Sequence, residues 1–211
     1  MKAIVYTKYD SPYVLELKEV EKPAPKDDEV LIKIHTASIN AYDWHFLTAD
    51  IFLIRLMGGG LLKPKYTRLG ADIAGPVEAV GRNIKQFQPG DEVFGDISHG
   101  GFAENVCAPE SRLALKPANL SFEEAAAVPM AALTALQGLR DEGQIHPGQK
   151  VLINGASGAR VASWLAWVAI ALPRSSVAEH SHPRASAHAL LPASHAPGWA
   201  RSLGNAGRSS R

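Results

Sequence analysis

The sequence predicts a mostly β domain that continues into the beginning of an α/β domain. Short runs rich in β-branched and aromatic residues alternate with Gly- and Pro-containing turns over residues 1–120. Helical signals replace these runs after Leu120. A buried strand at 150–154 then leads into a Gly-rich turn at 155–158, which is how a dinucleotide-binding βαβ unit begins.

The segment 70–93 organises the β domain. Four glycines punctuate it, Gly70, Gly75, Gly81 and Gly90, with apolar residues at strand-like spacing between them. Glycine is used where the backbone needs a positive φ or passes close to another segment. Read alone, this pattern is typical of a Gly-rich corner in a small β-barrel.

The remaining elements follow from local composition. Strands are expected at 2–7, 14–20, 29–37, 92–95, 101–108 and 112–116. Many short strands without a helical period predict a closed or nearly closed barrel. A short helix is expected at 51–57, and the glycines at 58–60 indicate either a lid or a plain surface loop.

Two helices should connect the domains. Ser121 and Glu124 form a capping-box pattern at the start of the first helix. Pro129 fits the first turn of a second helix, 130–139, which ends near Gly143.

Composition narrows the function classes. The net charge of +1 gives no case for a nucleic-acid or membrane-surface partner. The single cysteine, Cys107, excludes an internal disulfide framework, and its apolar surroundings indicate a buried structural thiol. The chain opens without a signal-peptide pattern, and its longest apolar run, 161–172, is shorter than the ~20 residues of a membrane helix. We therefore expect a soluble, cytoplasmic protein.

One motif is specific enough to suggest a family. The pattern G-x-x-x-x-G-x-V-x-x-V-G from Gly70 to Gly81, followed by G-D-x-V at Gly90, resembles the medium-chain dehydrogenase/reductase superfamily. The resemblance runs from Met1 to about Gly158. It implies a GroES-like catalytic domain at 1–120, and a helical connection with the first strand and turn of a Rossmann domain at 121–158.

The resemblance favours the branch without zinc. Asn40, Ala71 and Asp72 stand where zinc-dependent members have their catalytic ligands. An alanine cannot bind a metal, and an amide is a poor zinc ligand beside a thiolate. The four-cysteine structural zinc loop is also absent, because Cys107 is the only cysteine. We expect ordinary surface or loop roles for the histidines that precede residue 159, namely His35, His45, His99 and His146.

Without a metal, the remaining chemistry is hydride transfer from a reduced nicotinamide to a quinone or an α,β-unsaturated carbonyl. The segment 40–44 resembles the N-x-x-D-W motif of the zinc-free reductases, which implies that Asn40 and Asp43 lie beside the nicotinamide and the substrate. Asn40 could donate a hydrogen bond to a developing oxyanion, and Tyr42 could donate a proton. The residues alone also allow a loop cap or Asx-turn for Asn40 and Asp43, and simple packing for Tyr42.

The resemblance also implies a dinucleotide cofactor. Thr134 matches the helix threonine that approaches the nicotinamide, although it could instead bond only its own helical turn. Gly155, Ala156, Ser157 and Gly158 match the start of the pyrophosphate turn, whose backbone N–H groups meet phosphates. The resemblance favours NADPH as the cofactor. NAD(H) stays open, because the residue that distinguishes NAD from NADP sits at the end of a second Rossmann strand, and the family pattern ends before it.

The family pattern is lost after Gly158. Residues 159–211 contain no Lys or Asp and one acidic residue, Glu179, but six Arg and four His. Such composition is typical of low-complexity or out-of-frame sequence. We expect a helix only within 161–172, disorder beyond it, and a Rossmann sheet reduced to its first strand. A reading frame lost after Gly158 would explain the break, and the other two frames of the coding DNA would test this.

Two other function classes stay open. The chain could be a truncated, non-catalytic fragment whose barrel folds without binding a dinucleotide. It could also be a binding module whose His/Arg tail binds polyanions in a salt-dependent way. An unpaired strand at 151–153 would in addition favour aggregation or homo-oligomerisation through the incomplete sheet.

Overall fold

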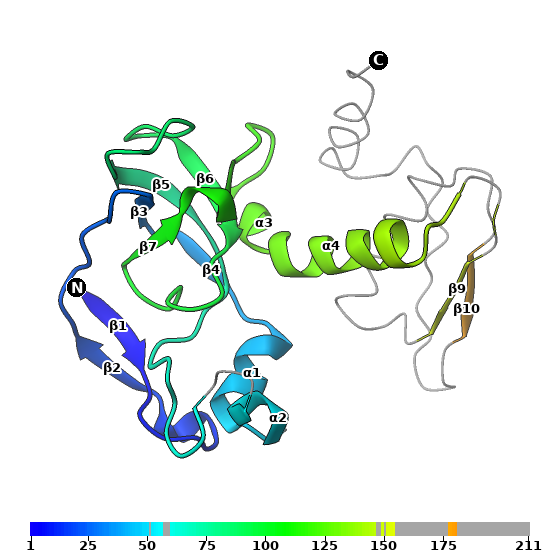
Figure 1. The fold of residues 1–211 in the computed structure, drawn as a ribbon, viewed down its shortest axis with the longest axis horizontal. Helices are drawn as coiled ribbons and strands as arrows, with labels where there is room; N and C mark the ends of the chain where they lie inside the picture. Colours follow the sequence, from blue (N-terminus) through cyan, green and yellow to red (C-terminus); the bar gives the residue numbers. More distant parts are fainter. Residues whose placement is uncertain (51, 57–59, 147–148, 150, 155–176, 181–211) are drawn as a thin grey trace. The chain divides into compact units, whose positions relative to one another are not determined.

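The computed structural model describes residues 1–50, 52–56, 60–146, 149, 151–154 and 177–180. The chain divides into two compact units, Met1–Met130 and Ala131–Arg211 (Figure 1). The domain boundaries expected at residues 120 and 158 stay predictions. Within the described ranges, no helix is long and apolar enough to cross a membrane.

An antiparallel sheet forms the centre of the first unit, which confirms the mostly β fold class. Its strands are β3 (Glu29–Lys33), β4 (Thr36–Ser38), β5 (Asp72–Val80), β6 (Glu92–Asp96), β7 (Asn105–Pro109) and β8 (Leu113–Leu115). The strand order is β7-β3-β5-β6-β8, and β4 also pairs with β5. The long strand β5, which lies in the Gly-rich segment, therefore pairs directly with β3, β4 and β6.

Smaller elements surround this sheet. β1 (Lys2–Val5) and β2 (Glu16–Glu19) form a two-stranded antiparallel sheet, and a 3₁₀ turn at Pro12–Val14 precedes β2. The helices α1 (Ala41–Thr48) and α2 (Phe52–Ile54) follow β4, and a second 3₁₀ turn, Glu110–Arg112, leads into β8. α2 is shorter than the helix expected at 51–57, whose two end residues lie outside the described part of the chain.

The core of the first unit lies on one face of the sheet. Its buried members are Val30, Ile32, Ile73, Val77, Phe87, Val93, Val106 and Ala108. Burying a side chain of this kind stabilises a fold by roughly 1.5–3 kcal/mol relative to leaving it exposed. Cys107 lies in β7 beside this core, and burial raises the pKa of its thiol to about 11, as expected for a structural cysteine.

The glycines of β5 and its approach have the two roles that the sequence predicts. Gly70 has φ +94°, in the region that favours glycine. Gly75 has ordinary backbone angles, but a Cβ atom there would collide with the carbonyl oxygen of Lys33 in β3. The sheet therefore needs glycine at Gly75 because two strands approach each other closely.

The strand expected at 29–37 is divided in two. β3 ends at Lys33 and pairs with both β7 and β5, whereas β4 begins at Thr36 and pairs with β5. Between them, the N–H of Ile34 donates to Glu104 and the N–H of His35 donates to Ala74. The chain therefore loses its pairing with β7 at 34–35 and keeps β5 as a neighbour, which a continuous apolar pattern does not reveal.

The helical connection agrees with the sequence. In α3 (Phe122–Ala126), the hydroxyl of Ser121 accepts from the N–H of Glu124 at 3.2 Å, and the Glu124 carboxylate accepts from the N–H of Ser121 at 2.9 Å. This confirms the capping box. α4 (Pro129–Leu136) begins at the expected proline and continues as a π-helical turn, Gln137–Glu142.

The second unit corrects one expectation. β9 (Val151–Asn154) pairs in parallel with β10 (Val177–His180), so the sheet has a second strand beyond the point where the family pattern is lost. The sequence did not predict β10 because it contains one β-branched residue, Val177. Pairing satisfies backbone groups that β9 would otherwise leave open on that edge. The helix and disorder expected elsewhere in 159–211 lie outside the described residues.

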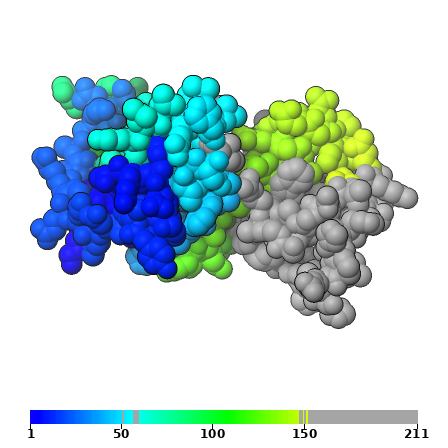
Figure 2. Space-filling view, turned by 90° about the horizontal axis from the view of Figure 1, so that it is seen from below, coloured from blue at the N-terminus to red at the C-terminus, as the bar shows by residue number. Residues whose placement is uncertain are grey.

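The segment after α1 presents apolar side chains to the surface. Figure 2 shows it in cyan beside the dark blue N-terminal strands. Its exposed large hydrophobic residues are Phe52, Leu53, Leu56, Leu61 and Leu62. Whether this segment acts as a lid or as a plain loop stays a prediction.

Candidate functional site

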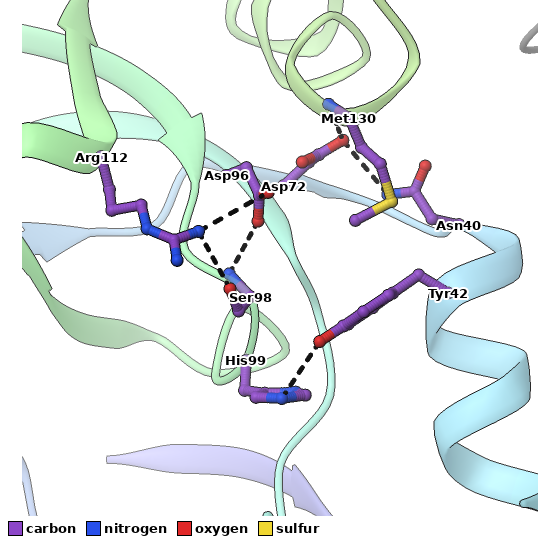
Figure 3. Close-up of polar contacts among 8 residues, drawn as sticks. All are labelled: Asn40, Tyr42, Asp72, Asp96, Ser98, His99, Arg112 and Met130. Carbon is purple, nitrogen blue, oxygen red and sulfur yellow. Dashed lines mark hydrogen bonds and ion pairs between the residues drawn. The ribbon is translucent and has the colours of Figure 1, made fainter. Parts of the chain in front are cut away.

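Asn40 is held by its side chain at the N-terminal end of α1. Its Nδ2 donates to Oγ of Ser38 at 3.2 Å. The same nitrogen donates to Oδ2 of Asp72 at 3.2 Å (Figure 3). An amide nitrogen has two hydrogens, so both are used within the protein. The Asn40 side chain also accepts from the N–H of Asp43 in the capping box of α1, as in the loop cap that the sequence allowed. The expected donation from Asn40 to an oxyanion stays a prediction.

Asp72 is the buried centre of this cluster. Its side chain is fully buried, and its Oδ2 also accepts from the N–H of Met130 at 3.0 Å. Among the described residues, its Oδ1 has no hydrogen-bond partner. Burial raises the pKa of this carboxyl to about 6, against the opposing effect of the Met130 N–H and the Asn40 amide. Asp96, its cross-strand neighbour in β6, raises that pKa further.

Asp43 connects α1 to the Gly-rich segment. One carboxylate oxygen accepts from the N–H of Asn40 at 2.8 Å, and the other accepts from the N–H of Gly70 at 2.8 Å. The side chain is 2% exposed, and burial raises its pKa while these two N–H groups oppose the rise. With both oxygens bonded to backbone, Asp43 fixes the positions of its neighbours, as in the cap that the sequence allowed.

Tyr42 points away from Asn40 toward the loop after β6 (Figure 3). Its hydroxyl lies 3.2 Å from Nε2 of His99, and its ring packs on Phe46 with 4.5 Å between ring centroids. Burial, followed by the negative charges of Asp96 and Asp43, raises the pKa of Tyr42 to about 12. Tyr42 is therefore a protonated phenol at neutral pH.

His99 lies in the loop after β6, as the sequence allowed, but it has more specific surroundings than an ordinary loop residue. It is half-buried, and burial lowers the pKa of its imidazole to about 4 although Asp96 acts in the opposite direction. The loop that carries it is firmly bonded. The N–H of Ser98 donates to Asp96 at 2.8 Å, and Nη1 of Arg112 donates to the Ser98 hydroxyl at 3.1 Å.

A groove opens beside this loop. Its volume is about 430 Å³, and it is lined by Lys65, Tyr66, Thr67, Arg68, Ile97, Ser98, His99 and Gly100. The ring of Tyr66 stacks on His99 with 3.9 Å between centroids. Aromatic faces next to polar and basic groups suit a flat molecule that carries oxygen acceptors.

The expected cofactor residues stay predictions. Thr134 is an exposed residue of α4 in the second unit. Gly155, Ala156, Ser157 and Gly158 lie outside the described residues. The absence of zinc also stays a prediction, although the described part of the chain contains no group of three His, Cys, Asp or Glu side chains that could hold a metal ion.

Sequence reasoning missed the roles of Asp72, His99 and Arg112. Asp72 was considered only as a poor match to a metal ligand. Its contact with Asn40 depends on β4 and β5 pairing so that Ser38 lies opposite Asp72. His99 lies 57 positions from Tyr42 in the chain, and no local pattern connects the two.

The comparisons with known proteins agree with this fold. The Alcohol dehydrogenase GroES-like domain matches residues 26–118. The 2-methylene-furan-3-one reductase of Solanum lycopersicum is 41% identical over 173 residues, which cover 75% of this chain and 41% of the relative. The chloroplastic NADPH-dependent alkenal/one oxidoreductase of Arabidopsis thaliana is 36% identical over 175 residues, which cover 75% of this chain and 42% of that protein.

Solved structures place the chain in the same group. The quinone oxidoreductase from Coxiella burnetii superposes with a TM-score of 0.75 at 29% identity, covering 87% of this chain and 57% of the other. In contrast, the match to the two curated relatives described above spans less than half of their length. Through its GroES-like domain, this chain belongs to the medium-chain dehydrogenase/reductase superfamily of oxidoreductases.

Proposed function

We propose that this chain acts as a zinc-independent, NAD(P)H-dependent reductase of quinones or α,β-unsaturated carbonyls. The observation that carries the proposal is the polar cluster at the start of α1. There Asn40 is bonded to the buried Asp72, and Tyr42 is bonded to His99, so the cluster offers neutral hydrogen-bonding groups. Reduction of an electron-poor carbon needs such groups, whereas oxidation of an alcohol usually depends on a Lewis acid.

Each residue of the cluster has a distinct role in this proposal. The reduced nicotinamide supplies hydride when it is bound. Asn40 would lie beside the nicotinamide and the substrate, where its amide could donate a hydrogen bond to the developing oxyanion. Tyr42, protonated at neutral pH, gives its proton to the oxygen of the reduced acceptor. Asp43 touches neither reactant and holds Asn40 and Gly70 in place.

For the cofactor we propose NADPH, with NAD(H) as the alternative. The name of the Arabidopsis relative specifies NADPH. Thr134 would contact the nicotinamide part, and Gly155, Ala156, Ser157 and Gly158 would offer backbone N–H groups to the pyrophosphate. A cytoplasmic location, with neither nucleic acid nor membrane as a partner, completes the proposal.

A second candidate is a fragment that folds without binding a dinucleotide. It is favoured by the change in composition after Gly158, since residues 159–211 contain no Lys or Asp. The matches cover 41–42% of the two relatives. The parallel sheet of the second unit has two strands among the described residues, β9 and β10, whereas parallel sheets in dinucleotide-binding domains are normally covered on both faces.

Steady-state oxidation of NADPH tests the proposal. The purified chain is mixed with NADPH and either 9,10-phenanthrenequinone or 3-buten-2-one, with and without EDTA. We expect turnover that EDTA leaves unchanged and that Tyr42→Phe reduces at least tenfold, while Tyr13→Phe at an exposed position has no effect. Activity that requires added zinc would contradict the proposal, and no turnover with either acceptor would favour the fragment.

A further inference from the structure

His99 is an aromatic-packed histidine that the proposed reaction leaves without a role. Its ring stacks on Tyr66 with 3.9 Å between centroids, and Phe46 meets it edge-on at 4.9 Å. Two segments that are distant in sequence thus hold the imidazole of His99, which itself follows β6. Phe46 belongs to α1, and Tyr66 precedes β5. A ring held in this way keeps its nitrogens in fixed directions.

The two nitrogens of His99 have different surroundings. Nε2 lies 3.2 Å from the hydroxyl of Tyr42. Nδ1 is buried and has no hydrogen-bond partner among the described residues. A neutral imidazole carries one hydrogen, on one nitrogen or the other. A buried N–H without a partner is costly and rarer than an under-used acceptor, so the surroundings favour the hydrogen on Nε2.

This tautomer determines the direction of the Tyr42 hydroxyl. If Nε2–H donates, the Tyr42 oxygen accepts from it and its own hydrogen stays free. If Nδ1–H were present instead, the Tyr42 hydrogen would be used by Nε2 and Tyr42 could not donate to a substrate. The state of His99 therefore decides whether Tyr42 can act as an acid.

We propose that His99 is a positioning residue for Tyr42, donating from Nε2–H to the Tyr42 oxygen so that the hydroxyl hydrogen stays free for the acceptor. This inference rests on the proposed reductase function. Tyr42 is not itself a lining residue of the groove, but His99 and Tyr66 line it, so an acceptor bound there would lie beside the ring that bonds Tyr42. No other described side chain makes a hydrogen bond to the Tyr42 hydroxyl.

The proton balance of the step is simple. A reduced nicotinamide, when bound, would supply a hydride with two electrons to the carbon of the acceptor. The acceptor oxygen then forms a bond to the Tyr42 hydrogen, and the O–H bond of Tyr42 breaks. The phenolate that remains is held by Nε2–H of His99 until water restores its proton. The net change is one hydride from the cofactor and one proton from solvent.

The charged groups around the pair are consistent with this role. Asp96 in β6 is the nearby negative charge that acts on both rings, and Arg112 lowers the pKa of Tyr42 in opposition to it. Tyr66 and Asp43 act on Tyr42 in the same direction as Asp96. A neutral His99 adds no net charge to this balance, so its contribution is the direction of one hydrogen bond.

Nitrogen-15 NMR of the full chain tests the tautomer without any turnover. The His99 signals are assigned by their loss in His99→Gln. We expect a single neutral tautomer with hydrogen on Nε2 from pH 5 to pH 8, and mixed tautomers in Tyr42→Phe, since Nε2–H then lacks its acceptor. A hydrogen on Nδ1, or signals that Tyr42→Phe leaves unchanged, would overturn the proposal.

A pair of substitutions separates hydrogen bonding from packing. His99→Phe keeps a ring between Tyr66 and Phe46 but removes the donor, whereas His99→Gln keeps an N–H donor but removes the ring. With NADPH and 9,10-phenanthrenequinone, we expect His99→Phe to lower kcat at least tenfold with KM within threefold, and His99→Gln to recover part of the loss. His146→Phe, at an exposed position, is the matched control.

The outcomes distinguish the two proposals. If the wild-type chain turns over and His99→Phe keeps its kcat, the positioning role is wrong and the reductase function stands. If the wild-type chain shows no turnover, the reductase function fails for this chain, and the NMR result alone decides whether His99 directs Tyr42. If a His99 variant shows no cooperative thermal unfolding, it has not folded. The NMR comparison of the wild-type chain with Tyr42→Phe is then used in its place, because that substitution removes a single hydroxyl.

Discussion

The two units of the chain differ in the sheets that their described residues form. In Met1–Met130, β3 to β8 pair in one antiparallel sheet, β1 and β2 form a second, and the side chains of Asn40, Tyr42 and Asp43 all have partners. In the described part of Ala131–Arg211, the sheet consists of β9 and β10. Two strands alone are marginally stable, whereas a larger sheet with a buried face can be stable independently.

The difference shows which part of the proposed reductase site is fixed by strand pairing in the described residues. The groups that would face the acceptor lie within the first unit and are fixed by its strand pairing. The groups that would face the cofactor lie in the second unit, which contains Thr134 and the turn at 155–158. Substitutions in the first unit should therefore have large effects on folding. Measurements of cofactor binding should instead detect changes in the second unit.

The largest effect is expected from the core of the first unit. Ile32 is fully buried in β3, so Ile32→Ala should lower the free energy of unfolding by about 4 kcal/mol through lost burial and a cavity. Urea unfolding monitored by circular dichroism measures this change. Ile4→Ala, at a side chain that is 37% exposed, should have a clearly smaller effect. Equal effects would mean that the described core does not stabilise the fold.

The second effect concerns pH and Asp72. Because its pKa is raised from 3.8 to about 6 on folding, Asp72 binds a proton more tightly in the folded protein than in the unfolded chain. Its contribution to stability is therefore complete below about pH 4 and is lost as the pH rises through 6, by up to about 3 kcal/mol. Asp72→Asn should flatten this part of the pH profile.

Urea midpoints between pH 4 and pH 7 provide the measurement for Asp72. Asp27→Asn changes an exposed carboxylate that is bonded to Arg82, so it controls for a general effect of charge removal. If the wild-type chain and Asp72→Asn have parallel profiles, Asp72 does not titrate in this range and the buried cluster is described incorrectly.

The smallest effect is expected at the close approach between β3 and β5. Gly75→Ala places a Cβ against the carbonyl oxygen of Lys33, and relieving that contact should cost about 2 kcal/mol. Gly90→Ala is the comparison, because a Cβ there meets no atom within 4 Å and only the φ of +98° is unfavourable. Thermal unfolding would show a lower transition for Gly75→Ala than for Gly90→Ala, and the reverse order would contradict the sheet register.

Sequence reasoning succeeded where local patterns determine structure. The capping box of Ser121 and the glycines around β5 could be predicted because backbone geometry restricts the residues that fit. The division of 29–37 into β3 and β4 could not, because it depends on which strands lie beside each half.

The candidate site was only partly predictable for the same reason. A motif of five residues identified Asn40, Tyr42 and Asp43 but not what their side chains bond. Asp72 and His99 reach them from strands and loops that are distant in sequence. The strand β10 was missed because a short segment with one β-branched residue carries no strand signal, and its pairing with β9 is a tertiary effect.

Titration of the purified chain with NADPH, followed by nicotinamide fluorescence, tests the central proposal most directly. We predict saturable binding in the micromolar range with a blue-shifted emission, since a bound nicotinamide leaves water for a less polar site. Thr134→Val should weaken this binding, and Thr7→Val in the first unit should leave it unchanged. No binding up to millimolar NADPH would contradict the proposed reductase and show that the chain retains the GroES-like domain without a working cofactor site.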